Sequence, residues 1–581
     1  MTPPRSIGPE ALLSALDAEQ RVVAETLVGP VCVLAGAGTG KTRAITHRIA
    51  FGVASGVYAP NRVMALTFTN RAAAELRGRL RMLGAGGVSA TTFHAAALSQ
   101  LNYFWPQVIG GQLPAILNAK GRLLGQAAER LTLRLDTATL REVAAEIEWR
   151  KVSGLSLDDY AAGLEHRVVP GRLSADQLVG MHQTYEDLKD ERRQFDFEDV
   201  LLACTGMVAA EPSVALQVRQ QYRFFVVDEY QDVSPLQQRL LDQWVGTRRD
   251  LCVVGDASQT IYSFAGARSA YLLEFPGRYP DAVQVRLEQN YRSTAPIVDT
   301  ANRLMRGRSG ALTLRAAPTE RPAAERPDAE PMIGVYPSDM VEARAVAQAI
   351  FDQVSRGAKP ESIAVLYRLN VQSAMIETAL SDVGISSQIR GSKRFFDLPE
   401  VKQAVMTLRA ASVSVSGEPL FKSVSDVLRS LGWSQQAPET RGAIRDRWES
   451  LNALMGLVDQ AEPGTTFRQF TDELMERRAG QHEPTVSAVT LATLHSAKGL
   501  EWDSVYLIGL SEGLVPISYA TGFEQVDEER RLLYVGITRA RRQLQMSWSR
   551  TGPQRGPVRA ESRFLAELGS RSPRAAGAGR R

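Results

Sequence analysis

Short apolar runs rich in β-branched residues alternate with helix-like segments, and this alternation constrains the fold more than any other feature. The first set is VCVL at 31–34, VMALT at 63–67, FFVVD at 224–228 and LCVVGD at 251–256. The second is MIGVY at 332–336, IAVLY at 363–367, VTLATL at 489–494, VYLIGL at 505–510 and LQMSW at 544–548. Apolar strands each followed by a helix are typical of a parallel sheet covered by helices. Because a single core stops growing at about 250–300 residues, this chain of 581 residues is predicted to form two α/β domains.

Each set of strands is interrupted by a strand-poor, helical stretch. One helical block contains LREVAAEIEWRKV and another precedes the strand at 489–494, so each α/β domain is predicted to carry a helical insertion. The Pro-, Ala- and charge-rich segment 315–331 is interpreted as an exposed loop. The expected boundaries are 1–97 with 189–278 for the first α/β domain, 98–188 for its insertion, 279–379 with 485–568 for the second, 380–484 for a reduced insertion, and 569–581 for a disordered basic tail.

The composition is that of an ordinary globular protein, with 44% hydrophobic and 23% charged residues. A net charge of +4 from 68 basic and 64 acidic residues is too balanced to indicate a nucleic-acid partner, so any basic track must be local. Cys32 and Cys252 lie inside strand-like runs, as expected in a reducing compartment. The sequence shows no signal peptide and no apolar stretch of about 20 residues. We therefore expect a cytoplasmic protein that does not enter a membrane.

The segment AGAGTGKT at 35–42 has the spacing of a phosphate-binding P-loop. Its glycines let backbone amides face the phosphates, Lys41 reaches the β- and γ-oxygens, and the Thr42 hydroxyl suits Mg²⁺. Ala35 stands where the strict motif has Gly. A strand precedes the loop and a helix follows it, which favours a nucleotide site over a glycine-rich turn that binds nothing. The predicted loop residues are Ala35, Gly36, Ala37, Gly38, Thr39, Gly40, Lys41 and Thr42.

Two acids follow the apolar run FFVV. Asp228 and Glu229 are placed at the carboxyl end of a strand, where α/β proteins bind ligands. Phosphoryl transfer needs a carboxylate for the metal and a group that orients water. We assign Asp228 to Mg²⁺ and Glu229 as general base. An isolated Asp-Glu pair is equally compatible with a surface turn, and it is the P-loop that favours catalysis.

Nine segments together resemble the UvrD/Rep-type superfamily 1 DNA helicases, in that family's order. They are LDAEQ (16–20), AGAGTGKT (35–42), ALTFTNRAA (65–73), TTFHA (91–95), VVDEYQD (226–232), VVGDASQTIYSFAGA (253–267), LEQNYRST (287–294), TLHSAKGLEWD (493–503) and EERRLLYVGITRAR (528–541). The resemblance implies two RecA-like P-loop domains, with ATP between them, and the cofactors ATP and Mg²⁺.

The resemblance also implies further nucleotide contacts. Gln20 would clamp the adenine edge, since its amide offers both a donor and an acceptor, although Asp17 stands where the family has Asn. Arginines from the second domain would act as fingers on the γ-phosphate. The implied set is Arg43 and Tyr291 at the base, Glu501 at the ribose, and Gln259, Arg292 and Arg539 at the γ-phosphate.

Single-stranded DNA is held by aromatic faces and by polar groups on the backbone. The positions that match such contacts in the family are Phe68, Thr92, His94, Tyr262, Phe264, Thr493 and His495. The alternative for Phe68 and Tyr262 is a place in the core. Phe264 and Ala265 stand where relatives carry Trp and Arg, and 549–564 has no aromatic residue before Phe564 to act as a duplex-splitting wedge.

Three hypotheses follow from these features. The first is an ATP-dependent 3′-to-5′ DNA helicase and single-strand translocase of repair or recombination, with polarity implied by the resemblance. The second is a translocase that strips bound proteins without robust unwinding, and the third is a nucleotide-gated DNA-binding subunit. The expected partners are single-stranded DNA, single-strand/duplex junctions and repair proteins, and the expected state is a monomer or weak dimer. The sequence does not separate DNA from RNA.

Overall fold

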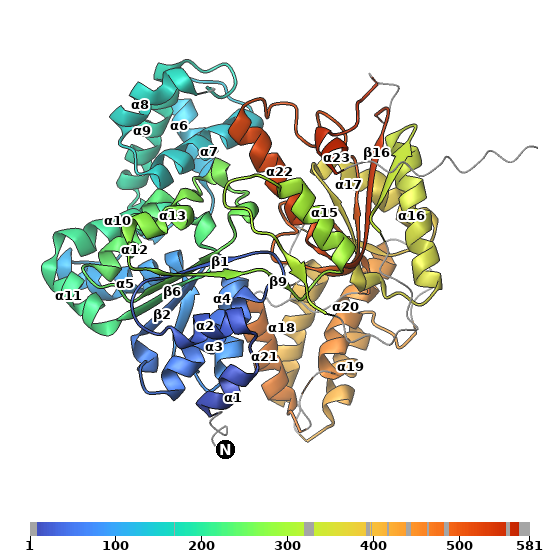
Figure 1. The fold of residues 1–581 in the computed structure, drawn as a ribbon, viewed down its shortest axis with the longest axis horizontal. Coiled ribbons are helices and arrows are strands. Elements are labelled where there is room, and N and C mark those ends of the chain that lie inside the picture. Colours follow the sequence, from blue (N-terminus) through green and yellow to red (C-terminus); the bar gives the residue numbers. More distant parts are fainter. Residues whose placement is uncertain are drawn as a thin grey trace, which may run out of the picture. The chain divides into compact units, whose positions relative to one another are not determined.

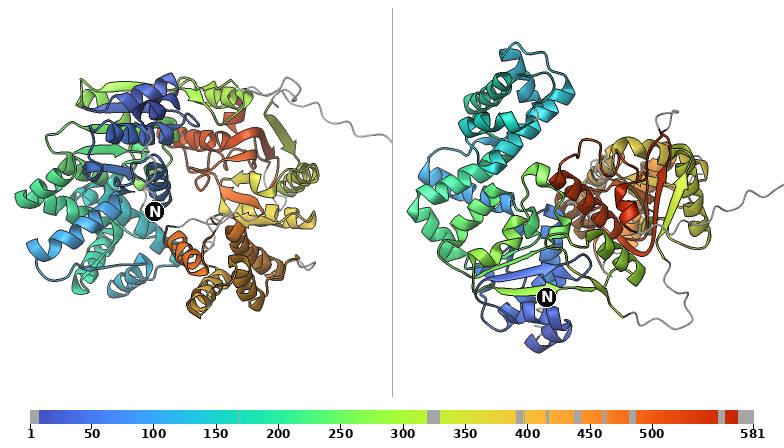
Figure 2. Two further views of the ribbon diagram at one scale, coloured as in Figure 1. Left: turned by 90° about the horizontal axis from the view of Figure 1, so that it is seen from below. Right: turned by 45° about the horizontal axis from the view of Figure 1, so that its top comes forward.

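The computed structural model divides the chain into two compact units, shown in Figures 1 and 2. The first unit is Met1–Glu288 with Arg308–Leu312, and the second is Gln289–Gly307 with Thr313–Arg581. The structure describes residues 8–167, 169–318, 330–390, 396, 398–414, 417–436, 443–459, 461, 464–480, 487–552 and 558–568.

The first unit is built on a six-stranded sheet in which all neighbouring strands run parallel, in the order β3-β2-β6-β7-β1-β8. The four predicted strands are present, and two more, β3 and β8, extend the edges. Since β8 pairs with β1 along its whole length, the first unit reaches Glu288, beyond the expected end at 278. The strands are β1 (Val31–Ala35), β2 (Val63–Thr67), β3 (Ser89–Thr92), β6 (Phe224–Val227), β7 (Leu251–Gly255) and β8 (Val283–Leu287).

Helices cover both faces of this sheet. They are α1 (Pro9–Ser14), α2 (Ala18–Glu25), α3 (Lys41–Ala54), α4 (Asn70–Met82), α5 (Phe93–Val108), α10 (Phe197–Ala210), α11 (Pro212–Gln221), α12 (Pro235–Val245), α13 (Ala270–Leu273) and α14 (Phe275–Arg278). The short 3₁₀ turns are η1 (Pro60–Arg62), η3 (Tyr230–Asp232), η4 (Ala257–Gln259) and η5 (Ser263–Ala265).

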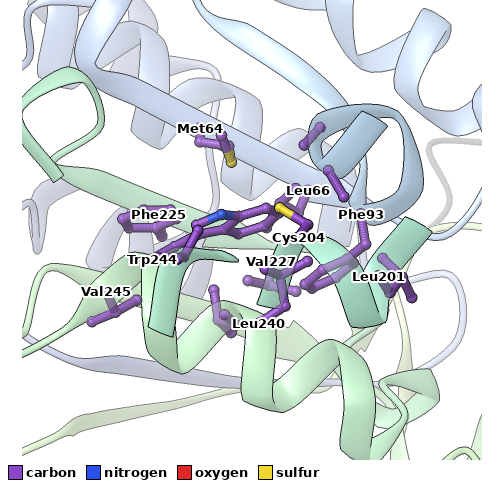
Figure 3. Close-up of a cluster of buried hydrophobic side chains, with 14 of the residues drawn as sticks. Met64, Leu66, Phe93, Leu201, Cys204, Phe225, Val227, Leu240, Trp244 and Val245 are labelled. Carbon is purple, nitrogen blue, oxygen red and sulfur yellow. The ribbon is translucent and has the colours of Figure 1, made fainter. Parts of the chain in front are cut away.

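Side chains of the central strands alternate between two cores, one on each face of the sheet. Met64 and Leu66 of β2 enter the core that is closed by Trp244 and Leu201 (Figure 3). Their neighbours Val63 and Ala65 enter the core beneath α3 and α4. Strands buried on both faces read as continuous apolar runs, which is why the sequence revealed them. All three cysteines are buried and unpaired, as expected for Cys32 and Cys252.

Between α5 and α10, where the helical insertion is expected, the described residues form four helices with their own core. The helices are α6 (Lys120–Arg130), α7 (Thr137–Ser153), α8 (Leu157–Gly163) and α9 (Ala175–Glu191), with the 3₁₀ turn η2 (Leu164–His166) after α8. A short strand pair, β4 (Ala115–Ile116) and β5 (Gln194–Phe195), closes the base of the insertion. Helices α5 and α9 run across the expected boundaries at 98 and 188. The core of the insertion includes Leu124, Ile147, Leu178, Met181 and Tyr185.

The second unit contains another six-stranded parallel sheet, in the order β11-β16-β15-β12-β14-β13. Its strands are β11 (Met332–Tyr336), β12 (Ile363–Tyr367), β13 (Ser387–Ile389), β14 (Val489–Thr493), β15 (Trp502–Leu507) and β16 (Ala540–Ser549), and β9 (Gln289–Asn290) pairs with β10 (Arg315–Ala316) nearby. Its helices are α15 (Ala295–Met305), α16 (Asp339–Ser355), α17 (Ser373–Asp382), α22 (Phe523–Ile537) and α23 (Arg563–Glu567), with η6 (Pro360–Ser362) and η7 (Asn370–Gln372). The mixed α/β fold with two parallel sheets confirms the predicted fold class.

The second insertion is also helical. It consists of α18 (Pro399–Ser414), α19 (Leu420–Ser430), α20 (Ala443–Asp459) and α21 (Phe467–Gly480), which pack around Leu408, Leu428, Leu451 and Phe470. Strand β13 falls inside the expected insertion range 380–484 but pairs with β14, so it belongs to the second sheet.

Among the described residues, no single helix is long and apolar enough to cross a membrane. Helices α10 and α11, which are bent by 105° relative to each other, are together long and apolar enough by length and composition alone. The expected disordered tail at 569–581 lies outside the described residues, as does most of the expected loop at 315–331.

Candidate nucleotide and nucleic-acid sites

The P-loop turns between β1 and α3, as the motif requires. Gly38 and Gly40 have φ of 72° and 78°, in the left-handed region that glycine adopts without strain. A Cβ atom at Gly40 would lie 2.6 Å from Nε2 of Gln20, so the loop and the predicted adenine clamp leave no room for a side chain there. Lys41 begins α3, and the backbone amides of the loop precede this helix N-terminus, the geometry that binds phosphate.

The ammonium of Lys41 is buried and makes no hydrogen bond to any described residue. It forms an ion pair with Glu229, with Nζ 3.6 Å from Oε2. A buried ammonium without hydrogen bonds is costly, and a phosphate oxygen is the acceptor that a P-loop lysine takes. The ammonium at this loop therefore fits the phosphates of a nucleoside triphosphate.

Asp228 and Glu229 follow β6 directly, so the sheet carries both acids to the edge where the P-loop lies. Asp228 Oδ1 accepts a hydrogen bond from the backbone N–H of Glu229 at 3.0 Å. The pKa of Asp228 is raised to about 7, chiefly by burial and then by the charge of Glu229, while Lys41 opposes the shift. Glu229 has φ of 53°, a left-handed conformation that is uncommon for a residue with a side chain and is often found at functional sites.

A hydrogen-bonded chain connects Glu229 to the predicted γ-phosphate sensor. Gln231 Nε2 donates to Glu229 Oε2 at 2.6 Å, and Gln231 Oε1 accepts from the backbone N–H of Asp256 at 3.0 Å. Asp256 Oδ2 in turn accepts from Gln259 Nε2 at 2.7 Å. Sequence reasoning missed Gln231 and Asp256, although both stand inside the quoted motifs, because nothing in the pattern shows which motif residues bond to one another.

The predicted adenine clamp is built by α1, α2 and α3. Gln20 is buried, and its Nε2 donates to the carbonyl of Thr39 at 3.0 Å. The departure at Asp17 is structurally conservative, because its carboxylate caps α2 by accepting from the backbone N–H of Gln20 at 2.7 Å. Arg43, predicted at the base, donates from Nη2 to the carbonyl of Ala15 at 2.5 Å.

Three of the predicted DNA contacts form one aromatic row. The rings of Phe68 and Tyr262 are stacked, with centroids 5.5 Å apart and planes 15° apart, and Phe264 meets Tyr262 edge-on at 6.1 Å. Phe68 is 43% exposed and Phe264 is 65% exposed. Large exposed rings are the surfaces on which bases stack. The alternative of a core position is therefore wrong for Phe68, and Tyr262 is half-buried between the two exposed rings.

His94 and Thr92 lie at the start of α5, and they differ in exposure. Thr92 is buried, and its hydroxyl caps α5 by accepting from the backbone N–H of Ala95 at 3.2 Å. His94 is half-buried, and burial lowers its pKa to about 4. Its ring packs on Phe197 with centroids 4.8 Å apart. Phe197 is 55% exposed at the first position of α10 and was not predicted. The sequence signal that could have indicated Phe197 is an apolar ring between the charged residues Asp196 and Glu198.

The second unit holds the predicted arginine fingers, the ribose contact and Tyr291. The guanidinium of Arg292 is ion-paired with Glu501, and its Nη1 donates to the carbonyl of Thr538 at 3.2 Å. Arg541 also pairs with Glu501. Thus Glu501 lies beside Arg292 and the backbone that precedes Arg539. Tyr291 is 50% exposed.

Arg539 is almost fully buried at the end of α22. Its Nε donates to the carbonyl of Val535 at 2.9 Å and its Nη1 to the carbonyl of Leu500 at 3.2 Å. These bonds anchor the guanidinium between α22 and the loop that carries Glu501. Its Nη2 donates to the hydroxyl of Thr538 at 3.1 Å.

Thr493, predicted as a DNA contact, is the last residue of β14 in the second unit, and His495, also predicted, follows the strand. The hydroxyl of Thr493 accepts from the backbone N–H of Ser496 at 3.2 Å and donates to its hydroxyl at 3.0 Å. Burial, followed by the charge of Arg368, lowers the pKa of His495 to about 4. Both histidines of the predicted track are thus neutral at physiological pH.

Two helicase family models match successive parts of the chain. The model for the UvrD/REP helicase N-terminal domain matches residues 16–280. The model for the UvrD-like helicase C-terminal domain matches residues 285–436 and 418–551. The chain therefore belongs to the UvrD/Rep helicase family, as the motifs predicted.

Individual relatives extend this similarity over nearly the whole chain. The chain is 44% identical to the ATP-dependent DNA helicase UvrD2 of Mycobacterium tuberculosis (strain ATCC 25618 / H37Rv), over 96% of this chain and 82% of the relative. It is 29% identical to DNA helicase II of Escherichia coli (strain K12), over 96% of this chain and 88% of the relative. It is also 29% identical to the ATP-dependent DNA helicase PcrA of Bacillus subtilis (strain 168), over 96% of this chain and 86% of the relative.

Proposed function

We propose that this protein is an ATP-dependent DNA helicase that translocates 3′ to 5′ along single-stranded DNA in repair or recombination. One observation supports it above the others. The buried ammonium of Lys41 lies beside Glu229 in the unit that also carries the exposed rings of Phe68 and Phe264. A phosphate-binding group and a stacking surface in one unit are what a DNA-stimulated ATPase requires.

In this proposal each residue of the P-loop region has a separate task. The loop amides and Lys41 bind the β- and γ-phosphates, and Thr42 with Asp228 holds Mg²⁺, which neutralises phosphate charge when bound. Glu229 orients the attacking water and accepts its proton. Its left-handed backbone directs the carboxylate toward Lys41, and Gln231 fixes that carboxylate through one oxygen.

The chain from Glu229 through Gln231 and Asp256 to Gln259 supports coupling between the nucleotide and the aromatic row. Gln259 ends η4, and Tyr262 directly precedes η5. A change at the γ-phosphate that displaces Gln259 would thus also displace Tyr262, because the two residues belong to one short segment. We propose that this segment converts ATP turnover into changes in base stacking.

Other assignments rest on family membership together with local geometry. We propose Gln20, Arg43 and Tyr291 as adenine contacts and Glu501 as the ribose contact. Arg292 and Arg539 are proposed to contact the γ-phosphate. Thr92, His94, Thr493 and His495 are proposed to line the DNA track, together with the newly found Phe197. We propose that the protein is cytoplasmic and that it acts as a monomer or weak dimer.

The experiment that tests the proposed function measures ATP hydrolysis with and without single-stranded DNA, beside unwinding of 3′-tailed and 5′-tailed duplexes. The helicase proposal predicts stimulated hydrolysis and unwinding of the 3′-tailed duplex alone. Stimulated hydrolysis with displacement of a bound protein but no unwinding would favour the protein-stripping translocase. Hydrolysis that DNA does not raise would favour a nucleotide-gated binding subunit and contradict the proposal.

A further inference from the structure

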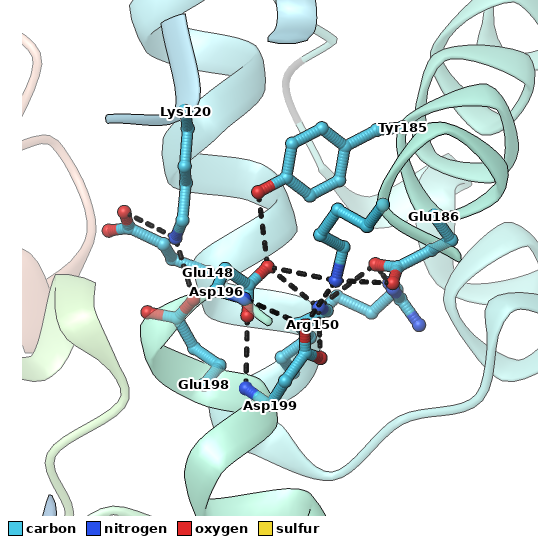
Figure 4. A network of polar contacts seen from close by, with 10 residues as sticks. Lys120, Glu148, Arg150, Tyr185, Glu186, Asp196, Glu198 and Asp199 are labelled. Atoms are coloured by element: carbon cyan, nitrogen blue, oxygen red, sulfur yellow. Dashed lines mark hydrogen bonds and ion pairs between the residues drawn. The ribbon is translucent and has the colours of Figure 1, made fainter. Parts of the chain in front are cut away.

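A buried network of ion pairs lies where the insertion of the first unit joins α10 (Figure 4). Lys151 of α7 contacts Asp196 at 2.8 Å, Asp199 at 2.6 Å and Glu186 at 3.0 Å. Lys189 of α9 contacts the same three carboxylates, including Asp196 at 3.2 Å and Glu186 at 2.7 Å. Lys151, Lys189 and Asp196 are each no more than 3% exposed.

Cationic side chains surround the carboxylates of Glu186, Asp196 and Asp199. The three carboxylates are matched by Lys151, Lys189 and Arg150, whose Nη2 donates to Glu186 Oε1 at 3.0 Å. The hydroxyl of Tyr185 donates to Asp196 Oδ2 at 3.2 Å. Burial alone would raise the pKa of Asp196, but the ammonium groups of Lys151 and Lys189 outweigh it and lower that pKa. A buried group of this kind contributes little net stability compared with apolar packing, so specificity of geometry is the better reason for its presence.

One end of the network determines where α10 begins. Asp196 and Asp199 form a reciprocal capping box at the start of this helix, so the carboxylates that bind Lys151 also hold the first turn of α10. Phe197 is the first residue of that turn and packs on His94. The position of this exposed ring is therefore tied to Lys151.

The other end of the network determines the position of the aromatic loop. Val152 follows Lys151 and lies against Gly266, where an added Cβ would be 2.7 Å from Cγ2 of Val152. Gly266 closes η5, the turn that contains Phe264, and has φ of 89°. The last turn of α7 thus supports the loop that presents Phe264, with Lys151 holding that turn in place.

We propose that Lys151 is a positioning residue for DNA binding, because it fixes the spacing between the Phe197–His94 pair and the Tyr262–Phe264 loop. The proposal rests on the proposed function, in which both aromatic groups stack on the bases of a single strand. Ion pairs suit this task because they are directional, whereas an apolar contact of equal area permits α7 to slide along α10.

The test compares Lys151→Met with Lys189→Met. Both variants remove one ammonium from the same three carboxylates, but Lys189 lies on α9, which packs on α6 and α8 of the insertion. The concentration of single-stranded DNA that half-maximally stimulates ATP hydrolysis is measured for each. We expect Lys151→Met to raise it about tenfold, within the range for one lost stack, and Lys189→Met to raise it far less. Hydrolysis without DNA should be unchanged in both.

Hydrogen exchange of the backbone amides at 262–266 gives a readout that needs no DNA. These amides should exchange faster in Lys151→Met than in Lys189→Met. Val152→Ala, which leaves the ion pairs intact, should reproduce the DNA effect and keeps the test decisive if Lys151→Met fails to fold. In the double variant Lys151→Met/Val152→Ala, the effects of the two substitutions on the DNA requirement should not add, because both act through the contact between Val152 and Gly266.

Equal effects of Lys151→Met and Lys189→Met, or an unchanged DNA requirement in Val152→Ala, would overturn the positioning role. Wild-type hydrolysis that DNA does not stimulate is a different outcome, because it contradicts the proposed function before any variant is compared.

Discussion

Gln231 bridges two elements of the nucleotide site, since its Nε2 donates to Oε2 of Glu229 at 2.6 Å while its Oε1 accepts from the backbone N–H of Asp256 at 3.0 Å. The side chain is fully buried, so both ends of the amide depend on these partners. The bridge holds the proposed general base at a fixed distance from η4 and Gln259. Catalysis and coupling to DNA should therefore both depend on Gln231.

The first prediction concerns this bridge. Gln231→Met keeps the size of the side chain and removes its hydrogen bonds to Glu229 and Asp256. We expect the maximal rate of DNA-stimulated ATP hydrolysis to fall about tenfold or more, since a misoriented general base loses much of its effect. The KM for ATP should change little. Steady-state kinetics checks this, with Gln183→Met as a control on the exposed face of α9. A loss seen only in KM would contradict the role of Gln231.

The second prediction concerns the P-loop lysine. Lys41→Ala should abolish ATP turnover, because it removes the ammonium that is proposed to bind the β- and γ-phosphates. The midpoint of thermal unfolding without nucleotide should stay close to that of the wild type, since the ammonium makes no hydrogen bond to any described residue. Lys422→Ala, which removes a surface ion pair with Glu418, is the control. Near-normal turnover in Lys41→Ala would reject the P-loop assignment.

The third prediction concerns the most exposed ring of the aromatic row. Phe264→Ala should weaken binding of single-stranded DNA by about 1–3 kcal/mol, the usual cost of one lost base stack. Fluorescence anisotropy with a labelled oligonucleotide measures this. Phe351→Ala, an exposed phenylalanine on α16, should leave binding unchanged. If both variants bind as the wild type does, Phe264 is not a stacking residue.

The fourth prediction concerns the pH dependence of stability. The pKa of Asp228 is raised from 3.8 to about 7 in the folded protein, so between these values the folded state binds more protons than the unfolded state. The stability contributed by Asp228 is therefore lost as pH rises through this window. Asp228→Asn should raise the unfolding midpoint more at about pH 8 than at about pH 5, while abolishing hydrolysis. An equal change of the unfolding midpoint at both pH values would show that the pKa of Asp228 is not raised in the folded protein.

Much of the fold could be predicted from the sequence, because parallel strands buried on both faces leave long apolar runs. All nine predicted strands are present. In the two six-stranded sheets, the strands that were missed are those without such runs: β3 reads SATT, β8 reads VQVRL with polar alternation, and β13 reads SQI. Each lies at the edge of its sheet, where one side needs no apolar cover.

The candidate site was predicted less completely than the fold. Motif spacing gave Lys41 and Asp228, because phosphate chemistry requires those side chains at those positions. It could not give Phe197 or Lys151, whose roles depend on residues distant in the sequence. Lys151 in EWRKV resembles any lysine of a solvated helix, and only the packing of α7 against α10 shows that it is buried.

The measurement that tests the central claim most directly is ATP hydrolysis by the purified protein, with and without single-stranded DNA, alongside strand displacement on 3′-tailed and 5′-tailed duplexes. The account predicts that single-stranded DNA raises hydrolysis and that only the 3′-tailed duplex is unwound. Hydrolysis that single-stranded DNA leaves unchanged, or unwinding confined to the 5′-tailed duplex, would contradict it.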